Sequence, residues 1–309
     1  MNNRIRSLRS ALLLLLTAVI WGTAFVSQVT GMYSVGAFTF SASRNVLGAA
    51  VLVPVILIMR IRKRENGDNK SHNVKITVIA GIICGIVLTA ANLFQQFGLM
   101  TTTVGKGGFI TSLYIIFTPV LGIFVGRKVS LPVWLCVAAA AFGFYLLCIN
   151  EDLSVGIGDI LVFICSVIFA VHILVIDHFS SKIDGIMTAC IQLAVCALIS
   201  GVLAFIFERP SVDRIIEGIV PILYAGVLSS GVAYTLQIIG QRDLNPTVAA
   251  LIMSLESVIS SVAGYFAYQF GLLKEEQTMS SRQLIGCIII FAAVIFVQIP
   301  LPERKKKTV

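Results

Sequence analysis

Apolar residues occupy most of this chain in runs of roughly 20, the length that crosses the hydrocarbon core of a bilayer as a helix. Short polar or charged stretches separate the runs and mark the turns between them. Ten such runs are present, and each predicts a transmembrane helix. Their approximate limits are 11–30, 37–59, 76–98, 104–125, 131–149, 157–177, 186–206, 218–240, 246–268 and 283–300. The pattern therefore predicts an all-α integral membrane protein.

The composition agrees with this pattern. Hydrophobic residues make up 57% of the 309 residues, charged residues make up 12%, and the mean hydropathy is +0.96. A soluble domain carries about 25% charged residues, so these values exclude a soluble globular domain. They also exclude a disordered chain. All seven cysteines lie inside apolar runs without metal-site spacing, and we expect them to be packing residues.

Lys and Arg are distributed unevenly over the loops between the predicted spans. With ten spans, both ends of the chain lie on one side. That side holds seventeen of the 23 basic residues, whereas the opposite side holds four. Loops rich in Lys and Arg stay in the cytoplasm, so we expect both termini there and an uncleaved first span. This asymmetry accounts for the net charge of +8 without nucleic acid.

Two segments of the chain resemble each other at an offset of 142 residues. Residues 91–124 align with 233–266 without gaps, and nine of the 34 positions are identical, including a Gln pair and two Gly pairs. This similarity predicts a duplication, with five-helix halves at 1–152 and 153–303 and a basic tail at 304–309. Halves with an odd number of spans enter the membrane from opposite sides, as inverted repeats. Such transporters bind substrate near the midplane, between the repeats.

Polar residues in four spans fall on one side of each predicted helix. These stripes are Gly85, Thr89, Asn92, Gln95 and Gln96; Thr103, Lys106, Gly107, Thr111, Tyr114 and Thr118; Ser230, Tyr234, Gln237 and Gln241; and Glu256, Ser257, Ser260, Ser261 and Gly264. Lipid penalises such groups, so we expect the stripes to converge on a shared interior. Alternatively, the small and hydroxyl residues hold neighbouring helices together, as we expect for Gly81 and Gly85.

Seven residues of these stripes are candidates for binding a substrate. They are Asn92, Gln95, Gln96, Tyr114, Tyr234, Gln237 and Glu256. Glu256 lies near the centre of the ninth span and aligns with Tyr114 in the other half. A charge at this depth is costly and usually faces a cavity or a partner. Glu256 could therefore bind a substrate amine, carry a proton, or neutralise Lys106 or Arg44. Proton coupling is open, and no motif implies a cofactor or a metal.

Two basic residues inside spans are further candidates, for coupling or gating. Lys106 lies about two turns outward of Tyr114, or ~12 Å along the helix. It can snorkel to the outer surface or reach an anionic group in the cavity. Arg44 can pair with a carbonyl or an acid and hold helices together, or it can serve the site. For Trp21 we favour packing over a cavity position, and for His172 a packed or hydrogen-bonded core position.

Four segments carry a resemblance to a known family. They are AVIWGTAFV, SASRNVLGAAVLV, GLMTTTVGKGGFITSLYIIFTPVLG and LNPTVAALIMSLESVISSVAGYF. They are similar to the EamA branch of the drug/metabolite transporter superfamily, and the likeness extends over nearly the whole chain. The resemblance implies a ten-helix carrier of the bacterial inner (plasma) membrane, among relatives that export amino acids or other small metabolites. The family often has Pro after the Glu of the ninth helix. Ser257 stands there in this chain, which puts a proline kink in doubt.

The leading hypothesis is a secondary transporter that exports a small metabolite by alternating access around Gln95, Tyr114, Gln237 and Glu256. Its partners are then a small-molecule substrate and membrane lipids. The sequence contains no nucleophile triad, phosphate loop or metal-ligand cluster, so we do not expect an enzyme. Two alternatives remain: a translocator of a lipid-linked group, whose cavity would open sideways between helices, and a membrane scaffold that transports nothing.

Overall fold

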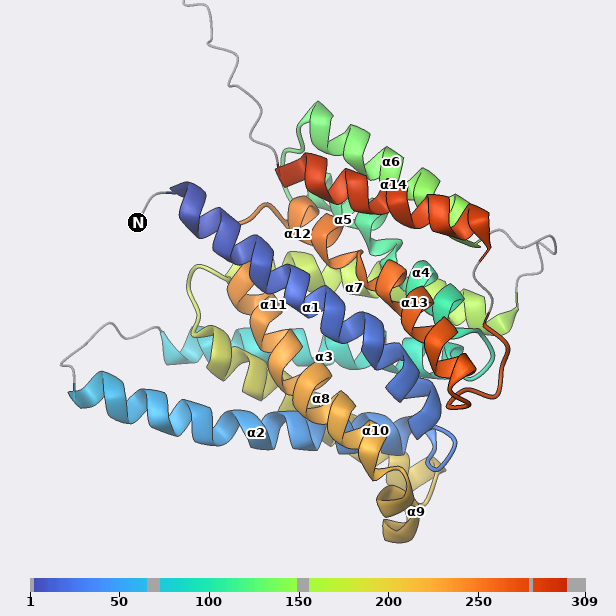
Figure 1. Ribbon diagram of the computed structural model, residues 1–309. Coiled ribbons are helices and arrows are strands. Elements are labelled where there is room, and N and C mark those ends of the chain that lie inside the picture. Colours follow the sequence, from blue (N-terminus) through green and yellow to red (C-terminus); the bar gives the residue numbers. More distant parts are fainter. Residues whose placement is uncertain (1–2, 66–72, 149–155, 278–279, 299–309) are drawn as a thin grey trace, which may run out of the picture.

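The computed structural model describes residues 3–65, 73–148, 156–277 and 280–298, and every regular element in these segments is helical (Figure 1). The elements are α1 (Asn3–Gly31), α2 (Ala37–Glu65), α3 (Val74–Gly98), α4 (Val104–Ser112), α5 (Tyr114–Phe124), α6 (Leu131–Cys148), α7 (Ile157–Phe179), α8 (Gly185–Phe207), α9 (Val212–Glu217), α10 (Ile219–Leu223), the π-helix η1 (Tyr224–Ala233), α11 (Tyr234–Gln241), α12 (Pro246–Met253), α13 (Glu256–Gln269) and α14 (Ser281–Gln298). The described part of the chain is thus all-helical, as the sequence predicts.

Eight helical segments in the described residues are long and apolar enough to cross a membrane, and each coincides closely with a predicted span. They are Ile5–Gly31, Ala37–Arg62, Val74–Gly98, Val104–Phe124, Ile157–Phe179, Gly185–Phe207, Ile219–Gln241 and Pro246–Gln269. The predicted spans 131–149 and 283–300 correspond to α6 and α14. Within the described residues their apolar stretches are Leu131–Leu146 and Ser281–Val297, and the description of each helix stops within two residues of that stretch. The predicted boundary at 152/153 and the tail 304–309 lie outside the described residues.

Three predicted spans are not continuous α-helices. The fourth is broken between α4 and α5, the ninth between α12 and α13, and the eighth passes through η1. Both breaks contain a tighter turn, because the Leu113 amide donates to Ile110 O (3.2 Å) and the Leu255 amide donates to Ile252 O (3.3 Å). Such i to i+3 bonds are typical of 3₁₀ turns at helix ends. Hydropathy alone did not indicate these breaks, since each predicted span is apolar enough over its whole length to cross a membrane.

The break in the ninth span forms without a proline. The Ser254 hydroxyl donates to Leu251 O and the Ser257 hydroxyl donates to Ser254 O, each over 2.8 Å. Hydroxyl groups that bond back to backbone carbonyls in this way compete with the helical ladder and bend helices. In the fourth span the break likewise comes before Pro119, which lies inside α5. The hydroxyl groups around Ser254 therefore interrupt the helix, an effect that proline has in many other helices.

Glycines allow several pairs of helices to approach closely. A Cβ atom added at Gly81 would lie 2.7 Å from Ile191 Cβ, and one added at Gly85 would lie 2.6 Å from Val195 Cβ, both on α8. These contacts confirm the predicted packing role of the two glycines. On the opposite side of the molecule α6 lies along α14 (Figure 1), where a Cβ at Gly143 would lie 2.8 Å from the Gly286 carbonyl oxygen. Only glycine permits these approaches.

Candidate functional site

A buried cavity of about 20 Å³ lies where the polar stripes meet, and it has room for about one water molecule. Its walls come from α1, α2, α3, α7 and η1 and from both sides of the break between α4 and α5, together with the first residues of α11 and α13. The lining residues are Trp21, Phe25, Gln28, Arg44, Gln95, Thr111, Tyr114, Phe169, Ser229, Tyr234 and Glu256. Five of the residues that the sequence singled out, Arg44, Gln95, Tyr114, Tyr234 and Glu256, are thus brought together.

One basic and one acidic side chain line the cavity. Arg44, from α2, is 2% exposed, and Glu256, the first residue of α13, is 3% exposed. Neither Arg44 Nε nor Glu256 Oε1 has a hydrogen-bond partner among the described residues, and no ion pair joins the two side chains there. The partner carbonyl or acid that we considered for Arg44 is likewise absent from the described part of the chain. The cavity therefore offers both a guanidinium and a carboxyl group to a ligand.

Tyr114 stands at the position in α5 that Glu256 holds in α13. Each is the first residue of the helix that follows a break, and both line the cavity. The Tyr114 hydroxyl is buried and has no hydrogen-bond partner among the described residues. Beside it, Gln95 is held in place because its amide donates to Thr111 Oγ1 over 3.1 Å. A buried hydroxyl close to the Glu256 side chain and next to a positioned amide is suited to contact a polar ligand.

Trp21 and Tyr234 form the aromatic part of the wall. Their ring centroids are 4.9 Å apart, and the Trp21 indole N–H donates to the Ser229 carbonyl of η1 over 3.2 Å. The Tyr234 hydroxyl donates to Asn92 Oδ1 over 2.9 Å. Trp21 packs against the core, as we favoured, and its ring also lines the cavity.

Three of the seven substrate-binding candidates are buried but do not line the cavity. Asn92 accepts the hydrogen bond of the Tyr234 hydroxyl. The Gln96 side-chain amide donates to the backbone oxygen of Gln28 over 3.3 Å. Gln237 is 1% exposed, and its Oε1 has no partner among the described residues. His172 lies nearby, with Nε2 3.3 Å from Gln192 Oε1, which is the hydrogen-bonded core position that the sequence favoured.

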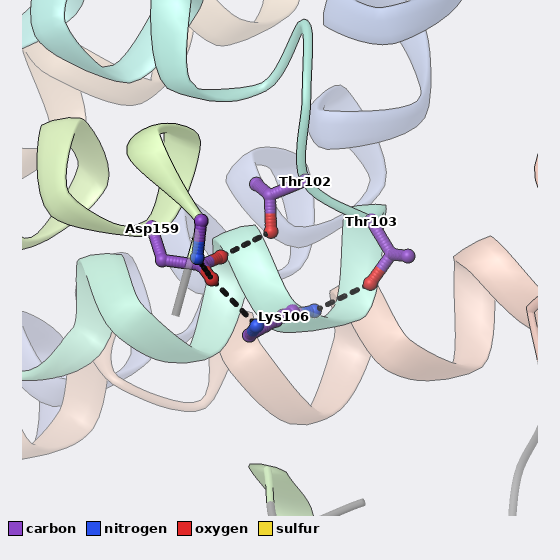
Figure 2. A network of polar contacts seen from close by, with 5 residues as sticks. Thr102, Thr103, Lys106 and Asp159 are labelled. Carbon is purple, nitrogen blue, oxygen red and sulfur yellow. Dashed lines mark hydrogen bonds and ion pairs between the residues drawn. The ribbon is translucent and has the colours of Figure 1, made fainter. Parts of the chain in front are cut away.

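Lys106 lies in a separate and larger space, which we call the vestibule. The vestibule has a volume of about 810 Å³ and is bordered by the end of α1, the turn between α3 and α4, the start of α7 and residues 273–277. Lys106 Nζ lies 2.6 Å from Asp159 Oδ2, and the Thr102 hydroxyl donates to Asp159 Oδ1 over 2.7 Å (Figure 2). The Gly156 amide also donates to this carboxylate, over 2.9 Å. Lys106 thus meets an acid in the vestibule and not in the buried cavity.

One apolar layer separates the vestibule from the cavity. Phe25, Leu99, Val104, Ala267 and Leu273 form a buried cluster. Phe25 borders the cavity, whereas Leu99, Val104 and Leu273 border the vestibule. A single buried apolar cluster therefore borders both spaces.

Several residues of this region were missed by reasoning from the sequence. Phe25 and Gln28 follow Trp21 at spacings of four and three, so all three share one face of a helix, and this signal was available. Asp159 is an acid at the start of an apolar span and was also detectable. Phe169 and Ser229 carried no such signal, because Phe and Ser are common in the other spans.

Comparisons with known proteins agree with this fold. A sequence model described as the EamA-like transporter family matches residues 8–149 and 156–299. A protein of Archaeoglobus fulgidus, described as an uncharacterized transporter, is 28% identical over 301 residues, which are 96% of this chain and 87% of the relative. A solved structure described only as a crystal structure of a protein matches with a TM-score of 0.69 and 18% identity. That match covers 93% of this chain and 96% of the other, and at this identity it concerns the fold alone.

Proposed function

The chain belongs to the EamA-like transporter family, and from that premise we propose that it is a secondary carrier exporting a small zwitterionic solute, an amino acid or a related compound. One observation carries the proposal: Arg44 and Glu256 line one buried cavity and form no ion pair with each other. Membership of the family makes the protein an integral membrane transporter. The substrate class, the direction and the mechanism are the parts that we propose.

A zwitterion fits the two charges better than a solute of one sign. A guanidinium binds a carboxylate through two parallel hydrogen bonds, and a carboxylate accepts hydrogen bonds from an ammonium group. A charge buried in a membrane protein is costly without a partner. One zwitterion offsets the cost of both Arg44 and Glu256, whereas a simple anion or cation leaves one of them uncompensated. Tyr114 and Gln95 add neutral polar contacts between the two charged ends.

We propose ten helices in two inverted repeats, with α6 and α14 as the fifth and the tenth. Two hydrogen bonds support this architecture. Ser112 Oγ donates to Ser254 O over 3.4 Å, and the Tyr234 hydroxyl donates to Asn92 Oδ1 over 2.9 Å; each joins residues 142 positions apart. Equivalent residues of two repeats touch each other only near the axis that relates the repeats. The offset is the one that aligns the two halves in sequence, with proposed limits of 1–152 and 153–303.

Transport then requires the cavity to enlarge and to open to each side in turn. The cavity volume of about 20 Å³ is far below the ~300 Å³ at the small end of ligand pockets. The apolar layer around Phe25 and Val104 is the barrier toward the vestibule, and the Lys106–Asp159 pair lies in the wall of this exit. Glu256 takes up a proton when the substrate amine leaves, which couples export to the proton gradient. The proposed outward direction rests on the family resemblance.

Thermal-shift measurements on the purified protein test the substrate class. We expect an amino acid at 100 times its Kd to stabilise the protein by about 2.7 kcal/mol. The N-acetyl and the carboxamide derivatives of the same amino acid each lack one charge, so we expect neither to bind. Glu256→Gln should lose the response to the free amino acid, whereas Arg60→Gln, which removes an exposed charge far from the cavity, should keep it.

Transport itself is tested in proteoliposomes loaded with the amino acid that stabilises the protein. Wild-type protein should release it faster when a proton gradient is imposed, and Glu256→Gln should release it at the same rate with and without the gradient. Equal binding of both blocked derivatives, or pH-dependent transport by Glu256→Gln, would refute the proposal. Activity on lipid-linked compounds alone would favour the translocator instead.

A further inference from the structure

A further cavity, distinct from the buried cavity and the vestibule, lies where α1 begins and α11 ends. It has a volume of about 400 Å³, and its polar wall is formed by Arg6, Arg9, Arg242 and Asp243. Leu13 and Ile239 form its apolar wall. We call this space the basic cavity. It lies at the opposite end of α1 from the vestibule, and none of its lining residues takes part in the proposed transport site.

The helices that form the basic cavity are in close contact. A Cβ added at Gly240 of α11 would lie 2.9 Å from Leu14 Cγ and 3.2 Å from Ser10 O, both on α1. Figure 1 shows α11 alongside α1. The cavity therefore lies next to a close contact between α1 and α11. This contact holds the residues that α1 and α11 contribute to the cavity at a defined distance from each other.

The charges of the basic cavity are not compensated within the described protein. Three guanidinium groups face one carboxylate, and none of these four side chains forms an ion pair or a hydrogen bond with a described residue. The ion pairs of the described residues lie elsewhere, at Lys106–Asp159 and Arg127–Asp177. A concave site with excess guanidinium groups is suited to a phosphate, because the planar donors of Arg match phosphate oxygens in pairs.

The position of the apolar wall indicates where the ligand comes from. Leu13 lies one turn deeper along the membrane-spanning part of α1 than Arg9, and Ile239 lies about one turn deeper than Arg242. The cavity thus joins a basic rim to an apolar floor at the ends of two helices that are apolar enough to cross a membrane. A phospholipid has the same order of groups, with an anionic phosphate outside and acyl chains inside.

We propose that the basic cavity binds the phosphate headgroup of an anionic phospholipid and that this lipid links α1 to α11. Arg6 and Arg9 hold the phosphate from α1, and Arg242 holds it from the end of α11. Basic residues at this face also direct membrane orientation, but orientation requires only their charge and not their convergence on one cavity. Arg60 and Arg62, at the end of α2, carry the same charge without lining this cavity.

Melting temperatures of the purified full-length protein in detergent test the proposal. Short-chain phosphatidylglycerol should raise the melting temperature of wild type by about 2–4 °C, the shift of a modest stabilisation in a chain of this size. Short-chain phosphatidylcholine, which has no net charge, should not. Arg9→Gln/Arg242→Gln removes one guanidinium from each wall and should lose at least half of the shift. Arg60→Gln/Arg62→Gln removes the same charge elsewhere and should keep all of it.

Three other outcomes of these measurements would change or overturn the proposal. Equal loss in both double variants would overturn the proposal, because the effect would then depend on charge and not on the cavity. An equal shift with inorganic phosphate would replace the lipid by a free phosphate-bearing solute. If Arg9→Gln/Arg242→Gln does not fold, native mass spectrometry of Arg242→Gln decides instead. This variant should retain fewer phosphatidylglycerol molecules than Arg60→Gln, and equal retention would overturn the proposal.

Discussion

Arg44 and Glu256 approach the same buried cavity from α2 and from the start of α13, and no ion pair within the described residues joins them. Each group therefore keeps the penalty of leaving water without the full attraction of a partner. Proteins retain such unfavourable groups where function depends on them. Stability and transport should consequently respond in opposite directions when one of these charges is removed.

Arg44→Met tests this opposition. Methionine has a similar length and carries no charge, so we expect the free energy of unfolding to increase by about 1–3 kcal/mol while substrate binding is lost. Thermal unfolding in detergent measures the first effect, and ligand-induced stabilisation measures the second. Arg60→Met on the exposed end of α2 should change stability by less than about 0.5 kcal/mol. A marked loss of stability in Arg44→Met would instead assign Arg44 a structural role.

The two cavity tyrosines should respond differently to loss of their hydroxyl groups. Tyr234→Phe leaves Asn92 Oδ1 without its donor, so we expect a loss of about 1–2 kcal/mol in stability. The Tyr114 hydroxyl makes no comparable hydrogen bond within the described residues, so Tyr114→Phe should change stability less than Tyr234→Phe does. If that hydroxyl binds substrate, Tyr114→Phe should lower affinity about tenfold, the effect of one hydrogen bond. The opposite ranking in stability would contradict the hydrogen bonding described here.

The Lys106–Asp159 pair should contribute measurably to stability. Lys106 retains 33% exposure of its side chain and Asp159 only 9%, so solvent screens the pair in part. A double-mutant cycle with Lys106→Met, Asp159→Asn and the combined variant should give a coupling of about 1 kcal/mol. Unfolding followed at low and high salt provides the measurement. Additive effects of the two substitutions would mean that the pair contributes nothing beyond its separate contacts.

Close packing beside the site should make Gly108 intolerant of even one methyl group. A Cβ there would lie 2.0 Å from Ser260 Oγ and 2.8 Å from Ser260 Cβ, so Gly108→Ala must push α4 away from α13. We expect a loss of about 1–3 kcal/mol in stability. Gly201→Ala is the matched control, because the nearest atom to its Cβ is Ala42 Cβ at 4.0 Å. It should be neutral or stabilising by up to about 1 kcal/mol, and equal effects at the two sites would exclude packing as the cause.

The breaks in the helices illustrate the limit of reasoning from hydropathy. The limits of the fourth and ninth spans were predicted closely, because an apolar run of sufficient length is helical wherever lipid surrounds it. The interruptions at Leu113 and Leu255 were not predicted. They depend on which nearby carbonyl accepts a hydrogen bond from each hydroxyl and backbone amide, as at Ser254 and Ser257. Hydropathy contains no information about these hydrogen bonds.

The polar stripes were predicted correctly as interior faces, but their individual roles were not separable in sequence. Gln95 reaches the cavity, whereas Gln96 beside it donates to Gln28 O. Adjacent residues point about 100° apart on a helix, and only the neighbouring helix determines which of them meets a cavity. Lys106 is a similar case, because its partner Asp159 is 53 residues away in the sequence.

The sequence by itself determined an all-helical membrane protein, the positions of its spans and the faces that avoid lipid. These properties are local, since the thickness of the bilayer and the bonding of each backbone group act on one segment at a time. Only the tertiary structure brought Arg44, Tyr114 and Glu256 to one cavity and placed Lys106 in another space. Those relationships depend on how helices rotate and pack against partners distant in sequence, and no single segment contains that information.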